Sequence, residues 1–234
     1  MSTKMVTAII LAGGLGSRMK SSETKQNIVI LGETVLERTL KAFAASSMVN
    51  DIIVVARDEE TDTVSTVIES LSICNACVVV GGETRANSAK NGFSAVKYSN
   101  GFVAIHDCAR CLVTPEMIDK VILSAFENGA ATAVCAVTDT VKLVDSDGMI
   151  KTTLPREKIY RAQTPQVFST EIYKRALESI GDKISEVTDD NMLVESIGVK
   201  IACVDLGQEN IKITTREDLD IAEFILQRRG KHNV

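Results

Sequence analysis

Residues 6–19 read VTAIILAGGLGSRM, an apolar run that breaks into three glycines and an arginine. The apolar part has the length and the β-branched content of a buried strand. Glycines directly after a strand let the backbone approach a ligand closely, often a phosphate. Two common phosphate-loop patterns are excluded. A dinucleotide fingerprint needs a third glycine where Met19 stands, and a Walker A loop needs Gly-Lys-Ser/Thr where the chain has Gly16-Ser17-Arg18.

Similar short apolar runs recur along the chain and alternate with amphipathic stretches. This alternation predicts an α/β fold with a doubly wound, mostly parallel sheet and helices on both faces. Capping signals predict helix starts at Thr34 and at Thr114-Pro115, and a final helix is expected from Thr215. We expect one domain over residues 1–234. The predicted strands are 6–11, 51–56, 76–81, 101–106, 131–137 and 199–206.

One segment interrupts the alternation. Residues 140–144 and 149–153 have the period of two short strands around a DSDG turn, which predicts a hairpin. The hairpin is too polar for a core element, so it is either a surface excursion or an arm that meets another subunit. Asp145 and Asp147 form a D-x-D pattern found in some glycosyltransferases, but their place in a turn favours a turn-forming role.

Composition excludes several classes of protein. The chain of 234 residues has a formal net charge of −5, so no global field attracts nucleic acid or an acidic membrane. No apolar run approaches the ~20 residues of a membrane span, and the N-terminus lacks the pattern of a secretory signal. We therefore expect a cytoplasmic protein without nucleic-acid or membrane partners. Any anionic ligand must be held by a local group of lysines and arginines.

Two C-x-x-C pairs, Cys74/Cys77 and Cys108/Cys111, have a spacing that also occurs in zinc sites. Neither pair has the surrounding glycines that often turn the chain around a zinc ion. We interpret the six cysteines as reduced thiols, which fits a cytoplasmic protein.

Further polar groups follow the predicted strands, where the ligands of doubly wound sheets bind. Residues 81–85 read GGETR, and Ser88 lies one turn into the helix expected to begin near Arg85. Asp107 follows another strand beside these phosphate-loop candidates, which suits Mg²⁺, since this ion prefers one or two carboxylates plus phosphate oxygens. His106 has no partner nucleophile and is expected to be a hydrogen-bonded structural residue. Lys212, in an expected late strand over 210–214, is predicted to point into the site.

These motifs, in this order and spacing, resemble the 2-C-methyl-D-erythritol 4-phosphate cytidylyltransferase family over residues 8 to about 226. The resemblance implies a Rossmann-like nucleotidyltransferase fold and a homodimer formed through a protruding β-arm at about 138–160. It also implies Mg²⁺-dependent transfer of CMP from CTP to a sugar-alcohol phosphate, with release of pyrophosphate.

The resemblance assigns roles to individual residues. Arg18 and Lys25 would neutralise the triphosphate and stabilise the transition state, and Asp107 would bind the metal. Thr140 and Arg156, on the arm, would reach the site from the other subunit. The residues implied to bind CTP are Ala12, Gly13, Gly14, Gly16, Gly82, Arg85, Ser88 and Lys212. The residues implied to hold the acceptor phosphate are Arg110, Thr140, Arg156 and Thr164, with Lys212 beside them.

The chain also departs from the family pattern. It has Gly13 where the family usually has alanine, within Leu-Ala-Gly-Gly instead of Pro-Ala-Ala-Gly, and it has Thr24 and Cys111 where the family usually has proline. Leu-Ala-Gly-Gly is closer to the related ribitol-5-phosphate cytidylyltransferases, whereas Asp139-Thr-Val-Lys142 is closer to the methylerythritol type. Ribitol 5-phosphate or another polyol phosphate is therefore the alternative acceptor. A glycosyltransferase and a non-catalytic nucleotide-binding module are further alternatives.

Overall fold

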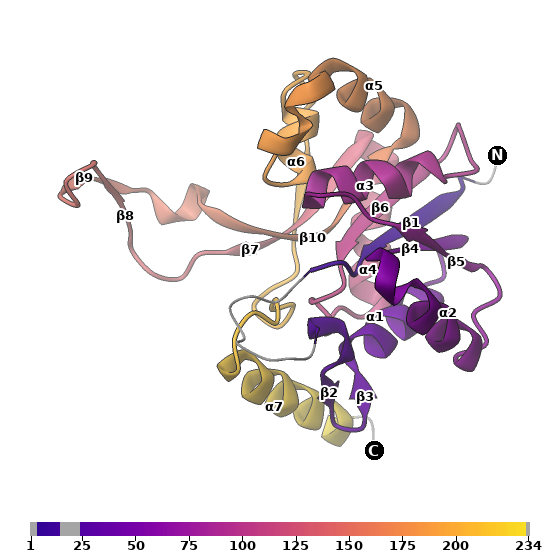
Figure 1. The fold of residues 1–234 in the computed structure, drawn as a ribbon. Coiled ribbons are helices and arrows are strands. Elements are labelled where there is room, and N and C mark those ends of the chain that lie inside the picture. The colour runs from indigo at the N-terminus through magenta and orange to yellow at the C-terminus, as the bar shows by residue number, and fades with distance from the viewer. Residues whose placement is uncertain (1–3, 15–23, 233–234) are drawn as a thin grey trace.

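A seven-stranded sheet with helices on both faces organises the chain (Figure 1). The structure is a computed structural model and describes residues 4–14 and 24–232. The strand order is β11-β7-β10-β6-β1-β4-β5, and all strands run parallel except β10, which is antiparallel to both of its neighbours. The predicted mostly parallel α/β sheet is thus confirmed. The strands that were predicted are β1 Val6–Leu11, β4 Asp51–Ala56, β5 Ala76–Val80, β6 Phe102–Asp107, β7 Ala130–Ala136 and β11 Ala202–Asp205.

The sheet is buried on both faces because its strands alternate their side chains between two cores. Along β1, Val6, Ala8 and Ile10 face one core, whereas Ile9 faces the other. The helices that cover the first core are α1 Val35–Ala44, α2 Thr61–Ser70, α4 Pro115–Asn128 and α7 Glu217–His232. The helices that cover the second core are α3 Arg85–Ser94, α5 Thr170–Ile180 and α6 Asp190–Glu195.

The predicted capping signals are present in the structure. Thr34 and Glu37 form a reciprocal capping box at the start of α1. Thr114 accepts a hydrogen bond from the backbone N–H of Met117, and Pro115 occupies the first turn of α4. The final helix begins at Glu217, two residues after the expected start, because Asp218 accepts hydrogen bonds from the backbone N–H groups of Thr214 and Thr215.

Strand β10, Tyr160–Ser169, pairs between β6 and β7 and was not predicted from the sequence. Its QTPQ stretch, residues 163–166, is polar and contains a proline, which is rare in central strands. The proline is tolerated because the β7–β10 register shifts between Ala162 and Gln166, so Pro165 lies where the ladder is irregular. The expected strand over residues 210–214 is also wrong. This segment is irregular and connects β11 to α7.

The predicted hairpin is confirmed as an arm that extends away from the rest of the chain (Figure 1). It consists of β8 Val141–Val144 and β9 Ile150–Leu154. At its tip, Asp145 accepts hydrogen bonds from the backbone N–H groups of Asp147 and Met149, which agrees with the expected turn-forming role. A second short hairpin, β2 Val29–Ile30 and β3 Glu33–Thr34, precedes α1.

Gly92 sets how closely α3 packs on the sheet. A Cβ atom at this position would lie 2.6 Å from Ile9 Cγ2 and 2.8 Å from Val55 Cγ2. Exposed glycine-to-alanine changes inside helices usually stabilise a protein by up to ~1 kcal/mol. Because of the overlap, we expect Gly92→Ala instead to lower the free energy of unfolding by about 1–3 kcal/mol, measured by urea denaturation. The control is Ser94→Ala, at an exposed position of the same helix. An unchanged or higher stability of Gly92→Ala would show that α3 is free to move outward.

Candidate functional site

A cavity of about 380 Å³ lies beyond the C-terminal ends of β1 and β6. Ligands of doubly wound sheets bind at this edge. The cavity brings together nine of the residues predicted from sequence, contributed by five separate segments of the chain. They are Ala12, Gly13, Gly14, Lys25, Gly82, Arg85, Ser88, Asp107 and Lys212. Gly16 and Arg18 lie outside the described residues.

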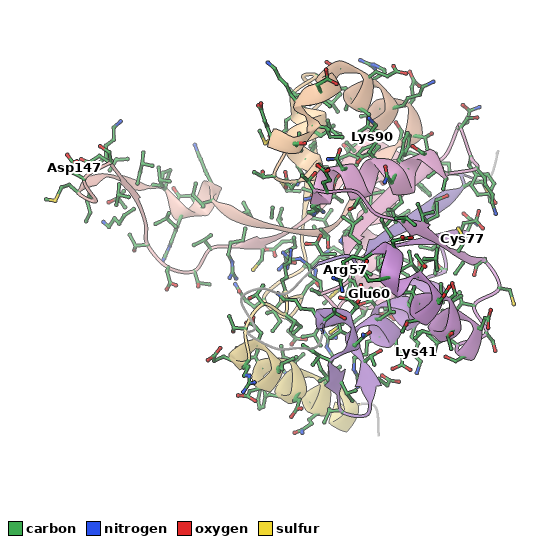
Figure 2. The ribbon with its side chains drawn as sticks, in the orientation of Figure 1. Lys41, Arg57, Glu60, Cys77, Lys90 and Asp147 are labelled. Atoms are coloured by element: carbon green, nitrogen blue, oxygen red, sulfur yellow. The ribbon has the colours of Figure 1, made fainter. Side chains whose placement is uncertain are left out.

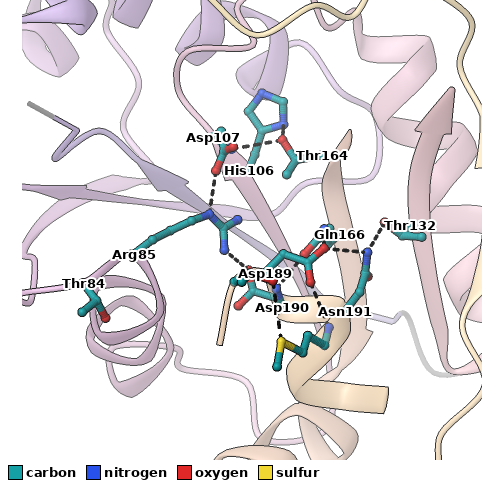
Figure 3. Close-up of polar contacts among 12 residues, drawn as sticks. Thr84, Arg85, His106, Asp107, Thr132, Thr164, Gln166, Asp189, Asp190 and Asn191 are labelled. Atoms are coloured by element: carbon teal, nitrogen blue, oxygen red, sulfur yellow. Dashed lines mark hydrogen bonds and ion pairs between the residues drawn. The ribbon is translucent and has the colours of Figure 1, made fainter. Parts of the chain in front are cut away.

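The carboxylate of Asp107 is bound by two cations. Arg85 Nε donates to Asp107 Oδ1 over 2.9 Å, and Lys212 Nζ donates to Oδ2 over 2.7 Å (Figure 3 draws the Arg85 contact). Burial raises the pKa of Asp107, but the positive charges of Arg85 and Lys212 outweigh it and hold that pKa well below its usual range. Asp107 is therefore ionised at neutral pH.

Arg85 also reaches a second carboxylate, that of Asp190 at the start of α6. Arg85 Nη1 donates to Asp190 Oδ2 over 2.7 Å, and the buried Tyr173 hydroxyl donates to Asp190 Oδ1 over 2.7 Å (Figure 3 shows Arg85 between the two carboxylates). Burial lowers the pKa of Arg85, but the carboxylates of Asp190 and Asp107 raise it above its ordinary value. The guanidinium is thus occupied within the protein. Its expected contact with cytosine stays a prediction.

Gly82 and Ser88 form the side of the cavity next to α3. The backbone N–H of Gly82 donates to Ser88 Oγ over 3.0 Å. A Cβ atom on Gly82 would lie 2.5 Å from the Cβ of Asn87, so the position requires glycine. Thr84 caps α3 by accepting a hydrogen bond from the backbone N–H of Asn87, so the positive end of this helix lies beside the cavity.

Gly13 is different, because it has room for a side chain. A Cβ atom there would meet Arg57 Cγ at 3.6 Å, an ordinary van der Waals distance. The alanine that the family usually carries at this position would therefore fit the same backbone. At the other end of the loop, Lys25 lines the cavity, and its Nζ donates to the backbone oxygen of Ile213 over 3.2 Å.

Thr164 lies behind Asp107 and is buried. Its hydroxyl accepts a hydrogen bond from the backbone N–H of Asp107 at 3.1 Å and contacts His106 Nδ1 at 3.0 Å (Figure 3). Burial lowers the pKa of His106 to about 3. His106 is therefore a neutral structural residue, as expected, and the role of Thr164 in phosphate binding stays a prediction.

The other predicted acceptor residues do not line the cavity of this chain. Arg110 donates to the backbone oxygens of Asn210 and Ala162, at 2.9 and 3.3 Å. Thr140 precedes β8, and Arg156 donates to the backbone oxygen of Thr138, so both belong to the base of the arm.

The two C-x-x-C pairs lie at opposite ends of the sheet. Cys77 is near the start of β5, whereas Cys108 directly follows the end of β6, and these strands run parallel through β1 and β4. About five strand residues at ~3.3 Å each separate the two ends. The four thiols therefore cannot share one zinc ion. Among the described residues, no group of three or more His, Cys, Asp or Glu is placed to hold a metal ion.

Several residues of the site were not found from sequence. Gln26, Glu83 and Thr84 line the cavity. Each of them lies next to a residue of a recognised motif, so its position in the sequence could have indicated it. Asp190 is 105 residues from Arg85 in the chain, and no local pattern indicates that pairing.

A doubly wound sheet with a cationic cavity at its carboxyl edge defines a nucleotide-binding α/β protein. The model of the family 2-C-methyl-D-erythritol 4-phosphate cytidylyltransferase matches residues 6–228, and the chain belongs to this family. A cytidylyltransferase of that name from Pelotomaculum thermopropionicum is 41% identical over 226 residues, covering 96% of this chain and 95% of the relative. One from Caldanaerobacter subterraneus is 39% identical, covering 95% and 99%.

The fold is also similar to solved structures. The crystal structure of 4-diphosphocytidyl-2C-methyl-D-erythritol synthase from Anaerococcus prevotii has a TM-score of 0.85 and 33% identity, covering 96% of this chain and 97% of that one. No helix in the described part of the chain is long and apolar enough to cross a membrane.

The buried neutral His106 predicts a pH dependence of stability. Its folded pKa of about 3 lies below the unfolded value of about 6.5, so the unfolded state binds the proton first and stability falls as the pH falls below 6.5. We expect the free energy of unfolding to drop by about 2 kcal/mol between pH 7 and pH 5, measured by urea denaturation. In His106→Gln this drop should disappear, whatever the absolute stability of the variant. An equal drop in the wild type and in His106→Gln would show that His106 does not cause the pH dependence.

Proposed function

We propose that this chain transfers CMP from CTP to 2-C-methyl-D-erythritol 4-phosphate and releases pyrophosphate. The observation that carries the proposal is the meeting of Lys25, Arg85, Lys212 and Asp107 in one cavity, together with membership of the family. The reaction needs the acceptor phosphate to attack the α-phosphorus of CTP in line with the leaving pyrophosphate. Positioning and positive charge are sufficient for this, and no protein nucleophile is needed.

The geometry of the described residues supports a role for each group. The backbone from Ala12 to Gly14 borders the cavity on one side, and Lys25 borders it near Lys212, since both adjoin the Ile213 segment. These groups would hold the phosphates of CTP. Gly82 and Ser88, which line the same cavity next to α3, would bind the cytosine. Arg18 would add a further positive charge to the triphosphate.

The described residues fit a Mg²⁺ ion that arrives with the nucleotide. Asp107 is an ionised carboxylate on the cavity wall, and Mg²⁺ is commonly bound by one or two carboxylates plus phosphate oxygens. Each oxygen of Asp107 already receives one cationic donor, so the carboxylate alone is a poor site for a dication. When bound, the metal would neutralise charge on the phosphates. Asp107 would hold it, while Lys212 shifts its contact from Asp107 toward the phosphates.

The arm supports a proposed homodimer. It exposes apolar side chains on a narrow hairpin, including Met149 at 66% and Ile150 at 65% of their surface. Apolar patches of this kind mark interaction sites. A second copy of the chain would cover them, and Thr140 and Arg156 would then face the partner's cavity and hold the acceptor phosphate with Arg110. We propose a cytoplasmic location, which is supported by the six cysteines being free thiols.

One prediction of the proposed function concerns the acceptor. Purified protein with CTP and Mg²⁺ should release pyrophosphate with 2-C-methyl-D-erythritol 4-phosphate at least ten times faster than with ribitol 5-phosphate, since one unsatisfied polar group at the acceptor costs about 1–3 kcal/mol. The glycine at position 13 does not argue against this acceptor, because the alanine that the family usually carries would fit the same backbone. Lys25→Ala should reduce kcat by on the order of 10²–10³. Faster release with ribitol 5-phosphate would establish the alternative acceptor, and release with neither would favour a binding module.

Another prediction of the proposed function concerns the arm. Ile150→Asp should convert a dimer into a monomer in analytical ultracentrifugation, because it places a charge in the apolar surface, and activity should fall with the dimer. Leu123→Asp is the matched control, since Leu123 is a similarly exposed apolar residue on α4, away from the arm. A wild-type protein that is monomeric and fully active would overturn the dimer proposal.

A further inference from the structure

We propose that Glu60, together with Arg57, is a positioning residue for Lys25 and acts through the side chain of Gln26. The inference rests on the proposed cytidylyl transfer for its effect on rate. It concerns two residues that do not themselves line the cavity. Both residues follow β4, Glu60 within the short helical turn Asp58–Glu60, and they lie close together in the structure (Figure 2).

The first step is the link from Glu60 to Lys25. Gln26 directly follows Lys25 and is almost fully buried, although both residues border the cavity. Gln26 Nε2 donates to Glu60 Oε2 over a distance of 2.7 Å. Lys25 and Gln26 form one short helical turn, Lys25–Asn27, so fixing the amide of Gln26 also fixes the backbone from which Lys25 extends.

The second step is the ion pair that fixes Glu60 itself. Arg57 Nε donates to the same oxygen, Glu60 Oε2, over 3.0 Å. Burial raises the pKa of Glu60, but the hydrogen bond and positive charge of Arg57, with contributions from Thr24 and Gln26, outweigh burial and hold the pKa below its ordinary value. The carboxylate therefore stays ionised, and it is held by donors from two segments of the chain.

Arg57 also lies beside the start of the glycine-rich loop. Its side chain passes beside Gly13, where a Cβ atom would meet Arg57 Cγ at 3.6 Å. The end of β1, just before this loop, is also held in place, since the N–H of Ala12 donates to the backbone oxygen of Val55 over 2.8 Å. Arg57 thus lies beside Gly13 at one end of the loop, and Glu60 is bonded to Gln26 at the other end.

A negative charge beside a cavity for a polyanion weakens the binding of that anion. Glu60 therefore does not serve to attract the ligand. Its buried carboxylate is explained by orientation, because a charged hydrogen bond fixes the amide of Gln26 more firmly than a neutral contact. A displacement of about 1 Å at a group that acts on the reacting phosphate can cost on the order of 10²-fold in rate.

Glu59 provides a matched control. Arg57 Nη1 donates to Glu59 Oε1 over 3.0 Å, nearly the same distance as the pair with Glu60. The side chain of Glu59 is 65% exposed, whereas that of Glu60 is 11% exposed and also bonded to Gln26. The two glutamates share an arginine partner and differ in their contact with the loop.

The test compares Glu60→Gln with Glu59→Gln in steady-state kinetics of pyrophosphate release. We expect Glu60→Gln to lower kcat about 10-fold, because the amide holds Gln26 less firmly, with an unchanged KM for the acceptor. Glu59→Gln should behave as the wild type. In a Lys25→Ala background, Glu60→Gln should have no further effect, because the residue on which it acts is absent. Gln26→Met should reproduce the Glu60→Gln defect without adding to it.

An equal fall in kcat from Glu60→Gln with and without Lys25 would overturn the inference and indicate a structural role alone. A normal kcat in both Glu60→Gln and Gln26→Met would overturn it as well. If the wild type has no transferase activity, the proposed function fails, and a second readout decides the inference. The ¹³C signal of reductively methylated Lys25, assigned by its loss in Lys25→Ala, should shift in Glu60→Gln but not in Glu59→Gln. An unshifted signal in Glu60→Gln would contradict the positioning role.

Discussion

The rest of the site depends on Asp107, whose carboxylate holds two cations at the end of the central strand pair. Arg85 comes from the first turn of α3 and Lys212 from the segment before α7, so one carboxylate joins three parts of the chain. Arg85 extends the connection to Asp190 in α6 and, through it, to Tyr173 in α5. The helices of one face are thereby tied to the carboxyl edge of the sheet, where the cavity lies.

This network is better understood as a means of orientation than as a source of stability. Buried ion pairs lose much of their Coulomb energy to desolvation. A protein with apolar residues of similar size in their place is often equally stable. The network instead keeps two cations in place beside the cavity that is proposed to bind CTP. Arg85 is fixed between two carboxylates, whereas Lys212 has Asp107 as its carboxylate partner and is more exposed. Lys212 is therefore the cation that a phosphate can recruit at lower cost.

Local sequence patterns accounted for much of this structure. The strands around β1, the caps of α1 and α4 and the arm could be predicted because each is set by neighbouring residues. β10 could not, because its polar QTPQ stretch is stabilised by pairing with β6 and β7 and not by its own composition. The cavity residues on glycine-rich loops were likewise predictable. The partners Asp190 and Glu60 were not, since their contacts join segments that are far apart in the chain.

Asp107 and Asp190 together fix Arg85, and a double-mutant cycle measures half of this arrangement. The free energies of unfolding of the wild type, Arg85→Met, Asp190→Asn and the double variant would be measured in urea. We expect a coupling energy of about 1–3 kcal/mol between the two changes, because each single variant leaves a buried charged or polar partner unsatisfied. Additive effects, with a coupling near zero, would contradict it.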